Sequence, residues 1–297
     1  MNNAFKGTGV ALITPFTRSA KIDYDSLGHI IDHIIEGGVD YIVALGTTSE
    51  APTMDEREKR QVAAFILEYT AGRVPLVLGM GGNNTKKLCD ELKEMDCTGY
   101  DAILSVCPYY NKPSQEGLFQ HFSMVAKASK LPIILYNIQG RTGVNMLPET
   151  VLRLVRSSEK FIGIKEASGN LDQIRRLLRI CPESFSVISG DDALTVDIIR
   201  QGGVGVISVL AHLYPSEVSA IVNDALEGKA DTAGERLHAM NDIITLLFKE
   251  GNPVGIKAAL SLYGMCHRNV RLPLVGASRS LISSLKKAIE AYDNSSR

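Results

Sequence analysis

The chain has 297 residues, of which 45% are hydrophobic and 22% are charged, and its formal net charge is -1. These values are typical of a globular protein and exclude a disordered or membrane-embedded chain. A net charge near zero gives no general electrostatic attraction to nucleic acid or to an anionic membrane. We therefore expect neither of these as a partner.

The five cysteines are an odd number and form no CxxC pair, which argues against a disulfide framework or a zinc cage and favours a reducing compartment. No apolar run is long enough to span a bilayer, and the N-terminal segment lacks the layout of a secretion signal. These features predict a cytoplasmic protein. His29 and His33 are one helical turn apart, but no further ligand completes a metal site, so we interpret them as surface histidines and predict no metal.

Short apolar runs alternate with helical patterns from one end of the chain to the other. The runs are mostly continuous in apolar residues, as expected for parallel strands that are covered on both faces. The predicted strands are Val10–Ile13, Tyr41–Leu45, Leu76–Leu78, Ala102–Val106, Ile133–Tyr136, Phe161–Lys165, Ser186–Ile188 and Gly205–Ser208.

Amphipathic stretches between these runs carry helix start signals. The expected signals are Asp25, Thr53 with Glu56 as a capping box, Ser114, and the pair Asp191–Asp192. After about Tyr214 the strand signal stops. The segments EVSAIVNDALEG, GERLHAMNDIITLLFKE and SRSLISSLKKAIEAY are then predicted as helices, with breaks at Pro253 and Pro273.

The pattern predicts the α/β class and, within it, a (β/α)8 TIM barrel over residues 1–225 with a C-terminal helical extension over residues 226–297. A doubly wound open sheet is the alternative. Such a sheet usually has a glycine-rich turn after its first strand, whereas here the first strand ends in the segment Leu12–Pro15, which contains no glycine.

Lys165 ends the apolar run Phe161–Ile164. A free amine with a pKa of about 10.4 is protonated at neutral pH. Apolar surroundings lower that pKa, and a neutral lysine can attack a carbonyl carbon to form a Schiff base. The alternative is a side chain that extends from the strand end into water.

Active sites of such barrels lie at the C-terminal ends of the strands. Thr47 and Thr48 offer hydroxyl groups that can hold a carboxylate, Tyr136 is a phenol placed to move protons, and Arg141 is suited to a second carboxylate. The glycines at 79–82 and the pair Asp191–Asp192 have simpler interpretations as a tight loop and a helix cap.

The segments GTTSE, PYYNKPSQEGLFQHF, YNIQGRTGV, GIKEASGNL and SGDDAL occur in this order along the chain. Together they resemble the 4-hydroxy-tetrahydrodipicolinate synthase family, whose members are pyruvate-dependent class I aldolases related to N-acetylneuraminate lyase. The similarity runs from about residue 5 to residue 290. It implies condensation of pyruvate with aspartate semialdehyde on the route to diaminopimelate and lysine.

The resemblance also implies roles for individual residues. Lys165 would form the Schiff base with pyruvate, so that no separate cofactor is needed. The proton relay would consist of Tyr136, Thr47 and Tyr110. The substrate-binding groups would be Thr48 for the pyruvate carboxylate, Arg141 for the semialdehyde carboxylate, and the backbone carbonyls of Gly190 and Ile207.

In this family the tyrosine matching Tyr110 reaches into the site of a neighbouring subunit. The resemblance therefore implies a homo-oligomer, commonly a tetramer built as a dimer of dimers.

Some positions depart from the family pattern. Ser49 and Gln139 stand where glycine and proline are usual, and neither change removes a reacting group. Lys87 stands where lysine-inhibited relatives have an acidic residue, and Glu56 and Lys59 stand where histidines are common. Because Lys87 would repel an ammonium group, we expect weak or absent inhibition by lysine.

Two other functions stay open on sequence grounds. One is another enzyme of the same superfamily, such as N-acetylneuraminate lyase or a 2-keto-3-deoxy sugar acid aldolase. The other is a barrel without catalytic activity, which would be expected to have lost part of the relay.

Overall fold

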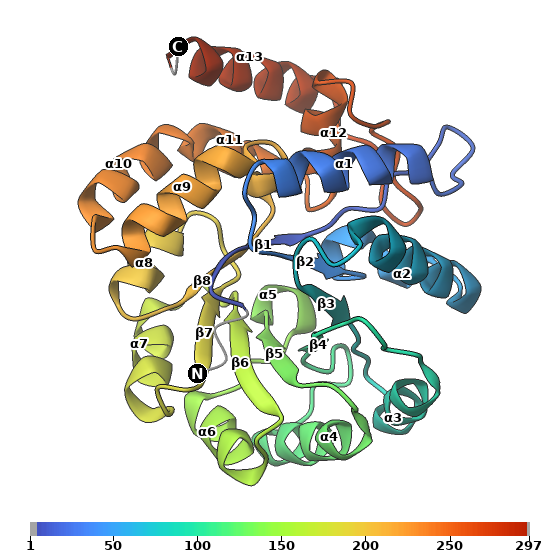
Figure 1. The fold of residues 1–297 in the computed structure, drawn as a ribbon, viewed down its shortest axis with the longest axis vertical. Coiled ribbons are helices and arrows are strands. Elements are labelled where there is room, and N and C mark those ends of the chain that lie inside the picture. Colours follow the sequence, from blue (N-terminus) through green and yellow to red (C-terminus); the bar gives the residue numbers. More distant parts are fainter. Residues whose placement is uncertain (1–4, 296–297) are drawn as a thin grey trace.

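A computed structural model describes residues 5–295 as a closed barrel of parallel strands surrounded by helices (Figure 1). Each strand pairs in parallel with the next, and β8 pairs with β1 to close the barrel. The strands are β1 (Gly7–Ala11), β2 (Tyr41–Ala44), β3 (Leu76–Gly79), β4 (Ala102–Val106), β5 (Ile133–Asn137), β6 (Phe161–Glu166), β7 (Ser186–Ser189) and β8 (Gly205–Ser208).

Helices follow the strands and continue beyond the last one, and most lie outside the barrel, whereas α5 lies within the ring of strands in the view of Figure 1. They are α1 (Tyr24–Glu36), α2 (Glu56–Thr70), α3 (Thr85–Glu94), α4 (Gln115–Ala128), α5 (Gln139–Thr142), α6 (Pro148–Ser157), α7 (Leu171–Ile180), α8 (Thr195–Arg200), α9 (Pro215–Leu226), α10 (Ala230–Ala239), α11 (Asn241–Lys249), α12 (Val254–Leu262) and α13 (Arg279–Ser295). Three short 3-10 turns add η1 (Thr47–Ser49), η2 (Ala51–Thr53) and η3 (Leu210–His212). The predicted (β/α)8 barrel is confirmed.

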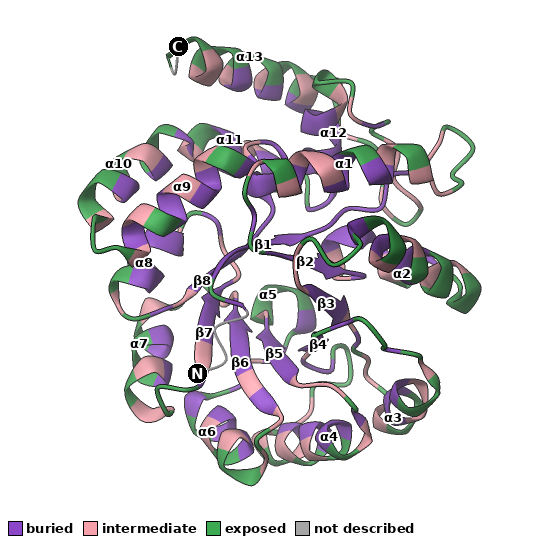
Figure 2. Ribbon diagram, viewed as in Figure 1, coloured by how far each residue is buried: buried purple, intermediate pink, exposed green. Residues whose placement is uncertain are grey.

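Side chains alternate between two apolar layers along each strand, as the pleat of a strand requires. In β2, Tyr41 and Val43 face the barrel interior, whereas Ile42 and Ala44 face the helices. The strands are buried on both sides, and most helices have one buried and one exposed face (Figure 2). This double burial explains why the strands are apolar without alternation in the sequence.

The first strand lies earlier than predicted, at Gly7–Ala11 instead of Val10–Ile13. Its two glycines weaken the strand signal, yet they pair with β8 through the registers Gly7 with Gly205 and Gly9 with Ile207. Ile13 lies beyond the ladder, and its N–H donates to Nε2 of His212 at 3.1 Å.

Several helix starts also differ from the predictions. Asp23, not Asp25, caps α1, and the capping box of α2 is Asp55 with Glu58, because the predicted cap Thr53 belongs to η2. Ser114 caps α4 as predicted.

The pair Asp191–Asp192 does not cap α8, which begins at Thr195. The segment GERLHAMNDIITLLFKE forms two helices, α10 and α11, which meet at Met240.

The C-terminal helices α11, α12 and α13 pack on one another beside the barrel (Figure 1). Helix α12 was not predicted, and it follows Pro253, where a break was expected. The predicted division between residues 225 and 226 falls near the end of α9 and stays a prediction. Within residues 5–295, no helix combines the length and apolar character needed to cross a membrane.

Candidate active site

Lys165 lies on the inner face of the barrel. Its neighbour Ile164 packs in the outer layer, so the alternation of β6 turns the Lys165 side chain inward. The residue is 6% exposed. In register it stands between Tyr136 of β5 and Ile188 of β7, which both belong to the inner apolar cluster. A side chain extending into water is therefore excluded for Lys165.

Burial lowers the pKa of the Lys165 amine to about 8 because the apolar interior disfavours its charged form. The carboxylate of Asp192 raises the pKa and the guanidinium of Arg141 lowers it, each less than burial does. With a pKa of about 8, about one amine in ten is neutral at pH 7, compared with about one in 2,500 for a free lysine.

Tyr136 and Thr47 lie beside this amine. The Nζ atom of Lys165 is 4.6 Å from the centre of the Tyr136 ring. The Tyr136 hydroxyl is hydrogen-bonded to Thr47, which lowers the phenol pKa, but the larger effect of burial raises it overall. A phenol with a hydroxyl partner can take up a proton and return it.

Thr48 and Arg141 are joined by Asn252, a residue that sequence reasoning missed. The Asn252 side-chain amide donates to Oγ1 of Thr48 at 2.9 Å, and the Asn252 carbonyl oxygen accepts from Nη2 of Arg141 at 3.1 Å. Because Thr48 accepts this bond, its own hydroxyl proton stays available for another acceptor.

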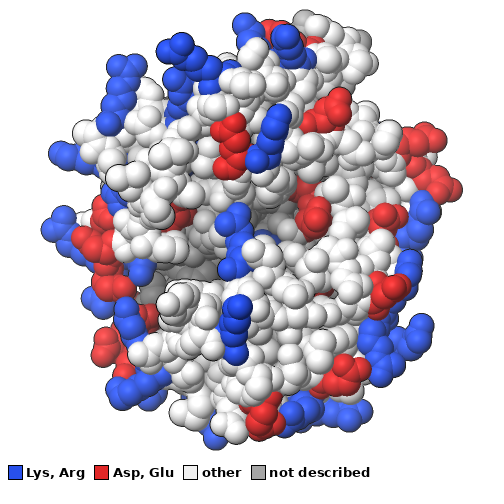
Figure 3. Space-filling view, turned by 180° about the vertical axis from the view of Figure 1, so that it is seen from behind, with Lys and Arg blue, Asp and Glu red and all other residues white. Residues whose placement is uncertain are grey.

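Thr47, Tyr136 and Arg141 share the wall of a cavity of about 390 Å³. The cavity continues past the ends of β3 and β4 to Glu91 and Glu94 on α3. In the face opposite to that of Figure 1, a hollow near the centre is flanked by Lys and Arg side chains (Figure 3). A cavity of this size accepts small metabolites.

Gly190 and Ile207 also lie at the reacting end of the barrel. A Cβ atom on Gly190 would be 3.0 Å from Cε and 3.1 Å from Cγ of Lys165, so the missing side chain makes room for the lysine. Ile207 is 1% exposed and belongs to the inner cluster. Of the predicted residues, three line the cavity (Thr47, Tyr136 and Arg141), Lys165 lies against Tyr136, Gly190 lies against Lys165, and Ile207 belongs to the same inner cluster as Tyr136. Thr48 follows Thr47 in η1.

Tyr110 is the predicted residue that stands apart. Its side chain is 88% exposed and it does not line the cavity, whereas the adjacent Tyr109 does. Its backbone adopts a left-handed conformation with φ of 72°. Within a single chain, the structure does not bring Tyr110 together with Thr47 and Tyr136.

Asp192 was predicted to be a helix cap, and that prediction is wrong. The carboxylate is buried and accepts from the hydroxyl of Ser208 at 2.5 Å and from the N–H groups of Val209 and Leu210 at 3.0 and 3.1 Å. It therefore fixes the end of β8 and at the same time acts on the pKa of Lys165. The motif SGDDAL includes Asp192, but nothing in the motif indicates that the carboxylate binds residues 208–210.

Charges of both signs line the outer part of the cavity. Glu56 and Lys59 form an ion pair at 3.0 Å, and the exposed Lys87 pairs with Glu91 at 3.3 Å. The hydroxyl of Ser49 donates to the Gly46 carbonyl oxygen at 2.7 Å and thereby stabilises η1.

Comparisons with known proteins agree over nearly the whole chain. The family model described as the dihydrodipicolinate synthetase family matches residues 4–292. The 4-hydroxy-tetrahydrodipicolinate synthase of Flavobacterium psychrophilum is 49% identical over 282 residues, which is 95% of this chain and 96% of that protein. The protein of the same name from Parabacteroides distasonis is 48% identical over 270 residues, or 91% of each chain.

A solved structure gives the same result. The crystal structure of dihydrodipicolinate synthase from Aquifex aeolicus has a TM-score of 0.94 and 39% sequence identity, and the match covers 97% of this chain and 98% of that one.

The charge of Asp192 provides a test of the lysine environment. We expect the rate at which Lys165 forms an imine with a keto acid to rise with pH and to level off above about pH 8, since only the neutral amine attacks. Asp192→Asn removes a charge that raises the pKa of Lys165, so the midpoint of this pH profile moves to lower pH. Borohydride trapping of the imine at a series of pH values measures the midpoint.

Asp191→Asn is the matched control, because Asp191 acts on the pKa of Asp192 and is not among the groups that shift the pKa of Lys165 directly. An Asp192→Asn midpoint equal to or above that of the wild type would contradict this interpretation.

Proposed function

Because the chain belongs to the dihydrodipicolinate synthetase family, we propose that it is a lyase that condenses pyruvate with L-aspartate 4-semialdehyde to 4-hydroxy-tetrahydrodipicolinate, a step of diaminopimelate and lysine biosynthesis. One observation carries the chemistry: a buried lysine amine with a lowered pKa lies beside a hydrogen-bonded tyrosine and threonine. Buried, tuned amines of this kind form Schiff bases with carbonyl compounds.

In the first stage, the neutral amine of Lys165 attacks the keto carbon of pyruvate. Tyr136 protonates the departing hydroxyl group, and water leaves to give an imine that joins the substrate to Lys165. Thr47 is hydrogen-bonded to Tyr136 and passes protons to and from it. The hydroxyl proton of Thr48, left free by Asn252, binds the pyruvate carboxylate. The covalent imine makes a separate cofactor unnecessary.

In the second stage, the pyruvate methyl group loses a proton and becomes an enamine carbon, with the imine nitrogen as electron sink. This carbon attacks the aldehyde of the semialdehyde, whose carboxylate binds the Arg141 guanidinium at the cavity mouth. The amino group of the semialdehyde then displaces Lys165 from the imine carbon, which closes the ring and restores the free amine. Gly190 and Ile207 contribute backbone carbonyls beside the reacting atoms.

We further propose that two subunits complete each site and that the assembly is a tetramer built as a dimer of dimers. Tyr110 is needed to continue the relay beyond Thr47, yet its exposed position in the single chain leaves it available to a neighbour. Such sharing is possible in any closed dimer, where each subunit donates the same residue to the other.

Pyruvate and aspartate semialdehyde are the substrates of this proposal, and the cytoplasm is its proposed location. The free thiol state of all five cysteines, each within the described residues, fits a reducing compartment. The family match and the relatives named 4-hydroxy-tetrahydrodipicolinate synthase favour the synthase over N-acetylneuraminate lyase, a 2-keto-3-deoxy sugar acid aldolase and an inactive barrel.

The proposed reaction is tested by a coupled condensation assay and by borohydride reduction with pyruvate. We expect condensation activity in the wild type and a covalent adduct on Lys165 by peptide mass spectrometry. Lys165→Arg should lose activity by about 10³-fold or more, because a guanidinium cannot become a neutral nucleophile. A fully active protein without an adduct would contradict the mechanism.

The role of Tyr110 is tested by mixing two inactive variants, Tyr110→Phe and Lys165→Arg. If each tyrosine serves the neighbouring site, a mixed dimer contains one site with both residues intact. Random assortment then restores about a quarter of the wild-type activity. If the tyrosine serves its own chain, mixing restores none, and the shared site is refuted.

Lysine inhibition tests the charge at Lys87. We predict no half-maximal inhibition of the wild type below about 1 mM lysine, since a cation repels the ammonium group of the ligand. Lys87→Glu should increase sensitivity to lysine. Strong inhibition of the wild type, or no gain in the variant, would show that this residue does not decide the response.

A further inference from the structure

Glu50 lies between the two short turns that follow β2. It ends η1 and precedes η2, and its backbone is left-handed with φ of 60° and ψ of 31°. A residue with a Cβ atom adopts this conformation at a cost, so surrounding contacts must maintain it. The residue is 2% exposed. Its conformation sets the direction in which the preceding threonines leave the strand.

Lys257 is the partner of Glu50. It lies on α12, which otherwise carries apolar and small residues, and its side chain is fully buried. Its Nζ atom is 2.5 Å from Oε1 of Glu50 and donates to the Asn269 carbonyl oxygen at 3.0 Å. The two residues are 207 positions apart in the sequence.

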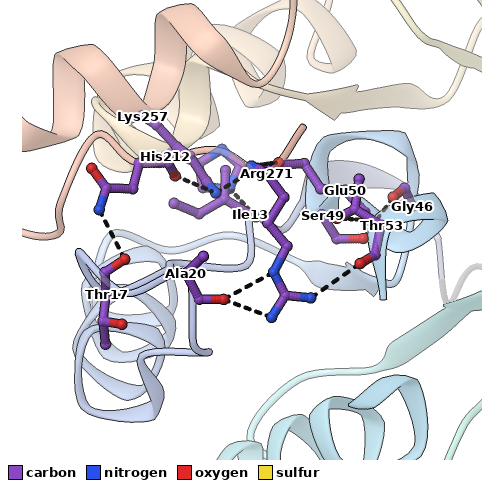
Figure 4. A network of polar contacts seen from close by, with 11 residues as sticks. Ile13, Thr17, Ala20, Gly46, Ser49, Glu50, Thr53, His212, Lys257 and Arg271 are labelled. Atoms are coloured by element: carbon purple, nitrogen blue, oxygen red, sulfur yellow. Dashed lines mark hydrogen bonds and ion pairs between the residues drawn. The ribbon is translucent and has the colours of Figure 1, made fainter. Parts of the chain in front are cut away.

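Arg271 extends the pair into a network (Figure 4). Its backbone N–H donates to Oε2 of Glu50 at 2.8 Å, so both carboxylate oxygens are held. Its guanidinium donates to Glu58 at 2.6 and 2.7 Å and to the Thr53 carbonyl oxygen at 3.1 Å. The Phe16 ring lies 4.1 Å from the Lys257 ammonium and 4.3 Å from the Arg271 guanidinium.

The network ends one turn away from the reacting groups. The Glu50 N–H donates to the Thr47 carbonyl oxygen at 3.3 Å, and Thr47 is the residue bonded to Tyr136. The same C-terminal segment supplies Asn252, which holds Thr48. The loop from Thr47 to Thr53 is thus attached at Thr48, Glu50 and Thr53 to the C-terminal segment 252–271, which contains α12.

Stability alone does not account for a buried ion pair. Removing two charges from water is costly, and apolar side chains of similar volume often stabilise a protein as well or better. A buried ion pair can instead fix the distance and orientation between two chain segments. Here one of those segments carries the threonines of the site.

We propose that Glu50 and Lys257 are positioning residues, which hold the Thr47–Thr48 turn in the geometry needed to bind pyruvate and relay protons. The proposal rests on the function proposed above. It makes the C-terminal helical segment part of the active site, although none of its residues need touch the reacting atoms. A displacement of about 1 Å in a positioning element can lower activity about 100-fold.

The experiment compares Lys257→Met, Glu50→Gln and the double variant Glu50→Gln/Lys257→Met. The single Lys257→Met change leaves a buried carboxylate without its cation and lowers the melting temperature. The double variant removes both charges and should melt closer to the wild type. Leu285→Ala is the control: it removes apolar packing from α13 and lowers the melting temperature without touching the network.

Melting temperature, kcat and the KM values for both substrates are measured for each protein. We expect kcat/KM for pyruvate to fall about 10- to 100-fold in every variant that lacks the pair. The KM for the semialdehyde should stay within about threefold of the wild-type value, because Arg141 lies on α5, outside the loop that Glu50 and Lys257 hold. Leu285→Ala should retain wild-type constants below its melting temperature.

A folded variant that lacks the pair and has wild-type constants would overturn the proposal, and so would an equal loss in Leu285→Ala. If Lys257→Met does not fold, Glu50→Gln and the double variant decide the question. Failure of the proposed function has a different signature: the wild type itself would neither condense the substrates nor form the borohydride-trapped pyruvate adduct.

Discussion

The burial of the Lys165 amine inside the barrel determines the properties of the surrounding site. A charged ammonium is unfavourable there, and burial lowers its pKa to about 8. The carboxylate of Asp192 opposes this effect by favouring the charged form, so that about one amine in ten is neutral at pH 7. In the proposed mechanism, this position on the inner face of β6 is what makes Lys165 a nucleophile.

The surrounding groups come from distant parts of the chain. Tyr136 stands beside the lysine because β5 and β6 pair in register, whereas Thr47 and Thr48 depend on a short turn after β2. That turn is in contact with residues 252–271, which follow the barrel in sequence. We infer that this C-terminal segment, beside the barrel, sets the shape of the barrel mouth. This arrangement explains why a charged pair is retained in an otherwise apolar environment.

The sequence predicted those features that depend on local patterns. Continuous apolar runs revealed the eight strands, and the alternation of faces explains why Lys165 is buried. The prediction placed the first strand too late in the sequence, because Gly7 and Gly9 have weak strand propensity. In the structure these two glycines pair with β8.

Features that depend on distant contacts escaped prediction. Aspartate is a common helix cap, so the sequence favoured that role for Asp192. Its partners, Ser208 and the first residue of η3, are distant in sequence and come close only in the folded chain. Lys257 did carry a signal, since a single charge in an apolar helix needs a buried partner. The sequence does not identify Glu50 as that partner, because the two residues are 207 positions apart and no local sequence pattern links them.

Crystals of the protein grown with pyruvate near pH 8 would show whether Lys165 binds the keto acid covalently. We expect continuous density from Nζ of Lys165 to the keto carbon of pyruvate, with the carboxylate against Thr48 and the Tyr136 hydroxyl facing the new bond. An unmodified Lys165, or one whose amine points into solvent, would contradict the proposed mechanism.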